Sequence, residues 1–120
     1  MESYDLPNMK LRTLSIGLNY GAIERGEIQA ADVFTTDPQL LRSDLVVLED
    51  NLKLFGFQNV SPAIRKDTLA RVGDDVPDAL NQLSALLTLD AMQAMNEAAA
   101  INRLDPAQVA KKFLSANNLI

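Results

Sequence analysis

The chain has 120 residues, of which 48% are apolar, and it carries a formal net charge of −5. This length fits one domain with its own core, and because acidic and basic residues are interspersed without a Lys/Arg stripe, the composition argues against a nucleic-acid site or a polybasic membrane-surface site. The sequence has no cysteine and no histidine, which excludes thiol chemistry, a Cys/His zinc site and a histidine-based catalytic triad.

The first half of the chain alternates apolar runs with turn residues. Such runs predict strands, and a continuous apolar run predicts a strand that is buried on both faces. Gly26 suits the end of a short helix around residues 22–24, whereas Asp37 followed by Pro38 suits the cap and first residue of another. The predicted strands cover residues 10–14, 27–36, 44–50 and 58–66, and Pro62 makes the last one an edge or bulged strand.

The second half has the sequence pattern of helices. Thr88 and Asp105 are N-cap residues, and Pro106 with Gln108 completes a capping-box arrangement after Asp105. Apolar residues recur at helical spacing between these signals. The predicted helices cover residues 66–72, 74–87, 89–101 and 106–116. This order of elements predicts an α/β domain with a mostly parallel sheet followed by C-terminal helices.

No set of side chains suggests catalysis or a metal site. Acidic residues gather at predicted helix starts, where the helix dipole favours negative charge, and their spacing does not match a calcium-binding loop. Met92 and Met95 fit a helix core better than a soft-metal site. Because no activated nucleophile is present, the chain is expected not to be an enzyme, and no cofactor is expected.

Thr35, Thr36 and Asp37 close the second predicted strand with two hydroxyls and a carboxylate. An ordinary helix cap explains this stretch, since Asp37 can accept amide hydrogens at a helix start. In open α/β sheets, however, ligands bind beyond the carboxyl ends of the strands. The two interpretations are compatible, because a capped helix start can also face a ligand.

Aromatic residues lie near the ends of the predicted strands. Tyr20 follows the first strand and Phe34 ends the second, whereas Phe55 and Phe57 precede the fourth. Rings around one cleft can hold a quaternary ammonium group through cation–π contacts worth about 1–2 kcal/mol each. Core packing is the alternative, and it accounts best for Phe55 and Phe113.

Four stretches of the chain resemble one protein family in register. They are ADVFTTD with the LVVLED that follows it, the Asn-x-x-Pro segment from Asn59 to Pro62, the pair LSALLT and MQAMN, and DPAQVAKKFL. Over residues 11–120 the chain is similar to the C-terminal half of the substrate-binding proteins of osmoprotectant ABC importers for glycine betaine, choline or carnitine. The resemblance implies a part of the two-lobed type II periplasmic-binding-protein fold, whose lobes close around the ligand.

The resemblance also implies which residues contact the ligand. Phe34 falls where family members place an aromatic residue of the cage around a trimethylammonium group. Thr35, Thr36 and Asp37 match the polar strand end beside that cage residue.

Four further positions follow from the same comparison. Gln58 falls where one branch of the family has a second cage tyrosine, so either Phe57 beside it supplies a ring or Gln58 forms a hydrogen bond with the ligand. Asn59 matches a polar position of a strand near the hinge. Tyr20 matches a residue that lines the cleft near a helix start.

The family's members are much longer than this chain. By resemblance, residues 1–36 form the end of the second lobe, residues 37–60 the crossover and hinge region, and residues 61–120 the C-terminal helical part of the first lobe. The implied partners are a small quaternary-ammonium ligand, an ABC permease subunit and a second copy of the chain that pairs through exposed strand edges. The alternative is a structural or oligomerisation module without ligand binding of its own.

The start of the chain, MESYDLPNMK, has neither the basic nor the apolar region of a signal peptide. The residues alone therefore predict either a cytosolic protein or a piece of a longer one. The resemblance implies a periplasmic or extracytoplasmic location, with membrane association through a parent lipoprotein or the permease.

Overall fold

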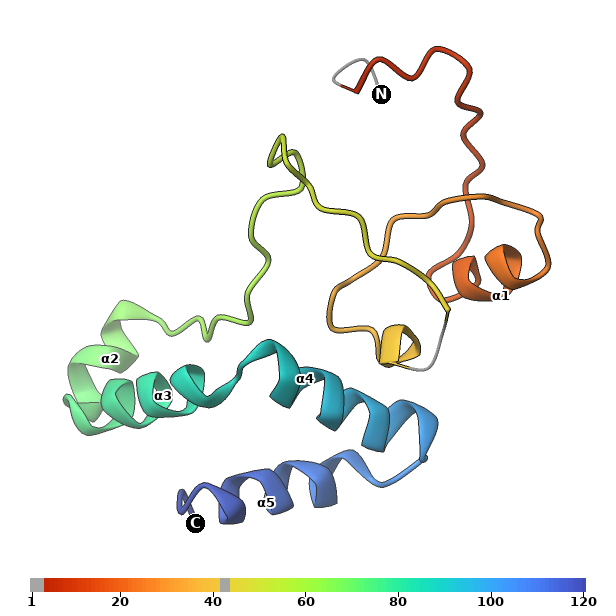
Figure 1. The fold of residues 1–120 in the computed structure, drawn as a ribbon. Helices are drawn as coiled ribbons and strands as arrows, with labels where there is room; N and C mark the ends of the chain where they lie inside the picture. Colours follow the sequence, from red (N-terminus) through yellow and green to blue (C-terminus); the bar gives the residue numbers. More distant parts are fainter. Residues whose placement is uncertain (1–3, 42–43) are drawn as a thin grey trace. The chain divides into compact units, whose positions relative to one another are not determined.

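The computed structural model describes residues 4–41 and 44–120, whose regular elements are short helices joined by loops (Figure 1). They are α1 (Asn19–Glu24), the 3₁₀ helix η2 (Pro38–Leu41), α2 (Lys66–Val72), α3 (Asp75–Leu86), α4 (Leu89–Asn96), the π-helix η3 (Glu97–Ile101) and α5 (Pro106–Ala116). No helix in the described part is both long and apolar enough to span a membrane.

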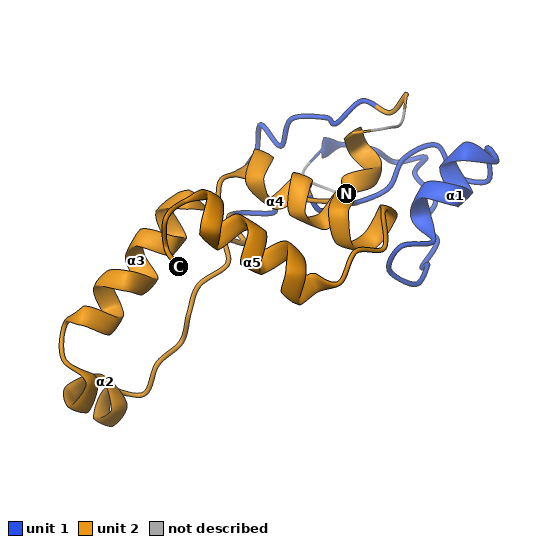
Figure 2. Cartoon of the chain, turned by 90° about the horizontal axis from the view of Figure 1, so that it is seen from below, with its two compact units in different colours: residues 1–34, 46–56 blue, residues 35–45, 57–120 orange. Residues whose placement is uncertain are grey.

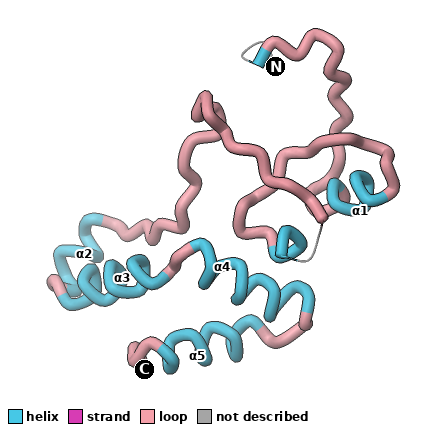
Figure 3. Tube along the Cα trace, in the orientation of Figure 1, coloured by secondary structure: helices cyan, strands magenta, loops and turns pink. Residues whose placement is uncertain are grey.

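The predicted α/β architecture with a mostly parallel sheet is wrong, because the described residues contain no strand (Figure 3). A strand is stable only when its main-chain N–H and C=O groups pair with a neighbouring strand, and an apolar run in the sequence cannot show whether that neighbour is present. Many apolar side chains of these runs are exposed to water instead, and Val46 and Leu48 are 82% and 81% exposed. The four stretches predicted as strands, residues 10–14, 27–36, 44–50 and 58–66, are loops and turns up to the first residue of α2.

The chain divides into two compact units, which are coloured separately in Figure 2. Unit 1 comprises residues 1–34 and 46–56 and contains α1. Unit 2 comprises residues 35–45 and 57–120 and contains η2, η3 and the helices α2 to α5.

In unit 1, Gly26 lies just beyond the end of α1, at the position that the sequence predicts. The N–H of Gly26 donates to the carbonyl of Ile23 at 2.8 Å, and the N–H of Glu27 donates to that of Ala22 at 2.9 Å. This pair of bonds is the Schellman arrangement, which satisfies the last carbonyls of a helix and requires a positive φ at its glycine, here +71°. Tyr20 and Ala22 are buried on this helix.

Exposed polar contacts surround α1. The amide of Asn19 donates to the carbonyl of Asp32 at 2.9 Å. Arg25 and Arg12 form ion pairs with Glu27 at 2.7 and 3.3 Å. The hydrogen bond from Arg25 is the main reason that the pKa of Glu27 is lowered. Pairs as exposed as these contribute little to stability.

A second cluster in unit 1 joins residue 4 to the loop that follows residue 50. The phenol of Tyr4 donates to Oδ1 of Asp50 at 3.0 Å, and the N–H of Phe55 donates to Oδ2 of Asp50 at 2.9 Å. Main-chain N–H groups, first of all that of Phe55, lower the pKa of Asp50. The pKa of Tyr4 is raised, first by desolvation and then by the hydrogen bond to Asp50.

In unit 2 the four predicted helices of the second half are confirmed, and their caps act as expected. Oγ1 of Thr88 accepts a hydrogen bond from the N–H of Ala91 at 3.2 Å, and Oδ1 of Asp105 accepts one from the N–H of Gln108 at 3.0 Å. Each cap satisfies one N–H group that has no partner inside its own helix. At the far end of α5, Asn118 adopts a φ of +56° and closes the helix.

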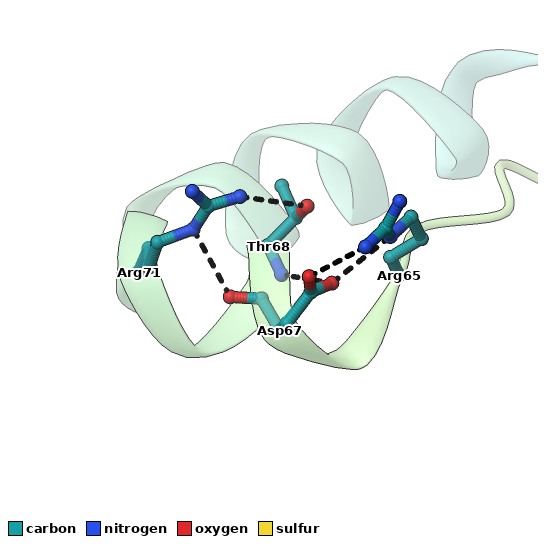
Figure 4. A network of polar contacts seen from close by, with 4 residues as sticks. All are labelled: Arg65, Asp67, Thr68 and Arg71. Carbon is teal, nitrogen blue, oxygen red and sulfur yellow. Dashed lines mark hydrogen bonds and ion pairs between the residues drawn. The ribbon is translucent and has the colours of Figure 1, made fainter.

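The start of α2 carries a polar network (Figure 4). Nε and Nη2 of Arg65 donate to the two carboxylate oxygens of Asp67 at 3.1 and 2.7 Å, which lowers the pKa of Asp67. Arg71 donates to the carbonyl of Asp67 at 3.3 Å and to Oγ1 of Thr68 at 3.4 Å. All of these contacts lie within residues 65–71, so the network stabilises α2 locally.

The part of unit 2 that positions the candidate site is the packing around η2. This short helix contacts both α4 and η3, and α5 contacts η3 from its own side. Pro38, the first residue of η2, is buried. Its fixed φ suits the first position of a helix, where no N–H is required.

Candidate ligand-binding site

Thr35 and Thr36 form a turn, and Asp37 joins this turn to η2. The N–H of Leu40 donates to the carbonyl of Asp37 at 3.2 Å, so the predicted helical turn begins at the predicted place, as a 3₁₀ helix. Thr35 is exposed, whereas Thr36 and Asp37 are half-buried. The three polar residues singled out in the sequence therefore lie at the N-terminal end of a short helix.

Two side-chain amides of α4 bond to this turn. Nε2 of Gln93 donates to the carbonyl of Thr35 at 2.6 Å, and Nδ2 of Asn96 donates to the carbonyl of Thr36 at 2.9 Å. Sequence reasoning missed both residues. The available signal was two amides at i and i+3 of a predicted helix, a spacing that places them on the same face.

The predicted aromatic contacts differ in exposure. Phe34 and Phe57 are 52% and 95% exposed, whereas Tyr20 is only 6% exposed. An exposed ring can offer its face to a cation, but a buried ring is already surrounded by protein. Tyr20 and Phe34 belong to unit 1, and Phe57 belongs to unit 2.

Gln58 and Asn59 lie in the loop of unit 2 that leads towards α2, and both side chains are exposed. An exposed amide has water on its donor and acceptor groups, so it can exchange that water for a ligand at little cost. The structure thus brings the turn of Thr35 and Thr36 together with α4, and it shows Gln58 and Asn59 as accessible.

The described residues contain two open hollows of note. One, of about 370 Å³, lies in unit 1 and is lined by Leu6, Pro7, Asn8, Met9 and Ala30. The other, of about 220 Å³, lies in unit 2 beside α4 and α5 and includes Met92, Met95 and Asn96. None of the eight predicted ligand residues lines either hollow. Within the described ranges, no three acidic side chains gather closely enough to suggest a metal site.

Comparison with known proteins decides the family. Residues 1–116 match the model of OpuAC, the substrate binding domain of ABC-type glycine betaine transport system. The chain belongs to this family. Membership confirms the resemblance seen in the motifs. It also confirms the prediction that the chain is not an enzyme, because the family is a substrate-binding component of transporters.

Individual relatives agree with the OpuAC assignment. The chain is 32% identical over 114 residues to the ergothioneine transport permease/ergothioneine binding protein EgtU of Helicobacter pylori. It is 27% identical over 117 residues to the carnitine transport binding protein OpuCC of Listeria monocytogenes, and 30% identical over 110 residues to a glycine-betaine-binding protein of Pseudomonas aeruginosa.

The matches cover most of this OpuAC-family chain but only part of each relative. They include 95%, 98% and 92% of the chain, against 20%, 38% and 35% of the three relatives in the same order. No solved structure gives a significant match.

Proposed function

We propose that the chain contributes to the substrate-binding component of an ABC importer for quaternary-ammonium compatible solutes such as glycine betaine or choline. The observation that carries this proposal is the family match over residues 1–116. In this proposal residues 1–36 end the second lobe, residues 37–60 form the crossover and hinge region, and residues 61–120 form the helical part of the first lobe. The component works outside the cytoplasm, where it delivers its solute to the permease.

The names of the relatives narrow the chemistry of the ligand. Glycine betaine, carnitine and ergothioneine are named for three relatives, and all three molecules combine a trimethylammonium group with a carboxylate. A binding site for such a molecule needs ring faces or a negative charge at one end and hydrogen-bond donors at the other. The proposed class is therefore small trimethylammonium carboxylates, with choline as the member that has a hydroxyl instead.

The predicted site residues supply both kinds of group. Phe34 and Phe57 each carry an exposed ring of the kind that a cation contacts, whereas the ring of Tyr20 is buried. Asp37 adds a carboxylate of opposite charge to the cation. The hydroxyls of Thr35 and Thr36 and the amides of Gln58 and Asn59 can donate to the carboxylate of the ligand.

Isothermal titration calorimetry of the chain with glycine betaine, choline, carnitine and ergothioneine tests the proposal. Binding of at least one of them, lost when the trimethylammonium group is replaced by a neutral tert-butyl group, is the expected result. No heat with any of the four compounds would contradict the proposal for this chain.

A second candidate function is a structural or oligomerisation module that pairs with a second copy of the chain. Large apolar side chains favour it, since Ile16, Val46 and Phe57 are 91%, 82% and 95% exposed, and exposed apolar surface of this kind marks association sites. Light scattering separates the two functions. A tight dimer whose melting temperature does not respond to any of the four solutes supports the module.

A further inference from the structure

We infer that Gln93 and Asn96 of α4 are positioning residues, which hold the turn of Thr35 and Thr36 in the shape that meets the ligand. The inference rests on the proposed function for the identity of the ligand. Its geometry rests on the two hydrogen bonds of 2.6 and 2.9 Å from the side-chain amides to the carbonyls of the turn.

The two carbonyls can face one helix only because the chain turns at this point. In an extended strand, successive carbonyls point to opposite sides, so a single helix could reach one of them but not both. Here the carbonyls of Thr35 and Thr36 both bond to α4, across 58 and 60 positions of sequence. The two bonds therefore select the turn against the extended form of the same residues.

The helix that makes these bonds is itself well fixed. The cap of Thr88 secures its first turn, and Asn96 is its last residue, directly before the π-helix η3. Both α4 and η3 contact η2, and π-helical turns in proteins are frequent at functional sites. A ligand group placed on such a support is held more accurately than one on a loop alone.

The hydrogen bonds also decide which groups of the turn are available to bind the ligand. The carbonyls of Thr35 and Thr36 are acceptors that α4 already engages. The hydroxyls of these two residues remain as groups that can both donate and accept. A donor is what the carboxylate of a trimethylammonium carboxylate requires, and the two hydroxyls can supply it.

Isosteric substitutions without a donor test the role of the two amides. Gln93→Glu and Asn96→Asp keep the size of each side chain but replace the donating NH₂ group with a carboxylate oxygen. Gln82→Glu and Asn81→Asp are the matched controls, because they make the same chemical changes at exposed positions of α3. Gln93→Lys keeps a donor on a long side chain and serves as the rescue variant.

Two readouts are made on the full chain. Hydrogen exchange of the amides in residues 35–41 reports the order of the turn without any ligand, and calorimetry with glycine betaine and carnitine reports affinity. We expect Gln93→Glu and Asn96→Asp to raise exchange and to weaken affinity about fivefold to tenfold each, the effect of one lost hydrogen bond. The α3 controls and Gln93→Lys should stay within about twofold of the unaltered chain.

Distinct outcomes separate this inference from the proposed function. Unchanged exchange of residues 35–41 in both variants would overturn the inference, as would raised exchange with unchanged affinity. If the unaltered chain binds none of the solutes, the proposed function fails, and exchange alone then decides whether the amides hold the turn. Should Asn96→Asp fail to fold, Gln93→Glu carries the test, because its contact is the more exposed of the two.

Discussion

The phenol of Tyr4 donates a hydrogen bond to Oδ1 of Asp50 at 3.0 Å, across 46 positions of sequence. The same phenol oxygen accepts a hydrogen bond from the N–H of Leu52 at 3.4 Å. One side chain near the start of the chain thus bonds to both the carboxylate and the main chain of a distant loop. Because unit 1 is rich in loops, contacts of this kind decide its local order.

This relationship predicts a response to both acid and alkali. The pKa of Asp50 is lowered below its ordinary value of 3.8, so its contribution to stability is present above that value and is lost as pH falls through the folded pKa. The pKa of Tyr4 is raised above 10.0, so its contribution is present below that value and is lost as pH rises through the folded pKa. The protection of the amides in residues 50–55 against hydrogen exchange, relative to an unstructured peptide at the same pH, should therefore decrease at both extremes.

Removing the carboxylate tests the same pair directly. Asp50→Asn should lower the pKa of Tyr4 only in part, because desolvation, the first cause of the shift, remains. The near-ultraviolet absorbance of tyrosinate measures this pKa, and Tyr20→Phe leaves Tyr4 as the one tyrosine observed, since the chain has two. A Tyr4 titration that is identical with and without the carboxylate of Asp50 would contradict the prediction.

Two glycine substitutions, one in α1 and one just after it, should change the free energy of unfolding in opposite directions. Gly26→Ala places a side chain at a φ of +71° and should destabilise the chain by about 1 kcal/mol. Gly21→Ala lies inside the helix and should stabilise it by up to about 1 kcal/mol. The new Cβ would lie 3.0 Å from Nη1 of Arg25, a flexible side chain that can move away. Urea unfolding followed by circular dichroism measures the free energy of unfolding of both variants. A change in the same direction for both would contradict the prediction.

The N-caps of α4 and α5 should contribute similar amounts to the free energy of unfolding. Thr88→Ala and Asp105→Ala remove the oxygens that accept from the N–H groups of Ala91 and Gln108, which should cost about 1 kcal/mol each. Asp105→Asn retains a capping oxygen and is the control. Thermal unfolding of the single and double variants measures the effect, and a control as destabilised as Asp105→Ala would show that the cap is not the cause.

Ligand affinity should depend on the exposed rings. Phe34→Ala and Phe57→Ala should each weaken binding of glycine betaine by about 1–2 kcal/mol if the rings contact the cation. Both rings are largely exposed, so neither substitution should change the melting temperature much. Phe55→Ala is a matched control at a ring that is 69% exposed. A loss of affinity as large for Phe55→Ala would show that the effect is not specific to the predicted cage residues.

The helices of the second half were predictable because their signals are local. Thr88, Asp105 and Pro106 act within three residues of the positions that they cap, so each signal can be read without knowing the rest of the fold. Gly26 belongs to the same class, since its positive φ is part of the helix end that it closes. The polar stretch from Thr35 to Asp37 was likewise visible, because its residue types and the following Pro38 are adjacent in sequence.

The strands were not predictable in the same way. The run around Val46 and Leu48 looks buried in sequence, but these side chains are 82% and 81% exposed. A strand depends on a partner that lies elsewhere in the chain, and an apolar run carries no information about that partner. Long-range contacts were missed for the same reason, including the bonds from Gln93 and Asn96 to the turn before η2.

The sequence by itself determined the family, the helix caps of the second half and the residue types at the candidate site, because each of these depends on short runs of neighbouring residues. Only the tertiary structure decided that the apolar runs of the first half stay unpaired in the described residues, and that α4 bonds to the turn of Thr35 and Thr36. The physical reason is range: caps and turns are closed within a few residues, whereas strand pairing and the amide bonds of α4 join positions far apart in the chain.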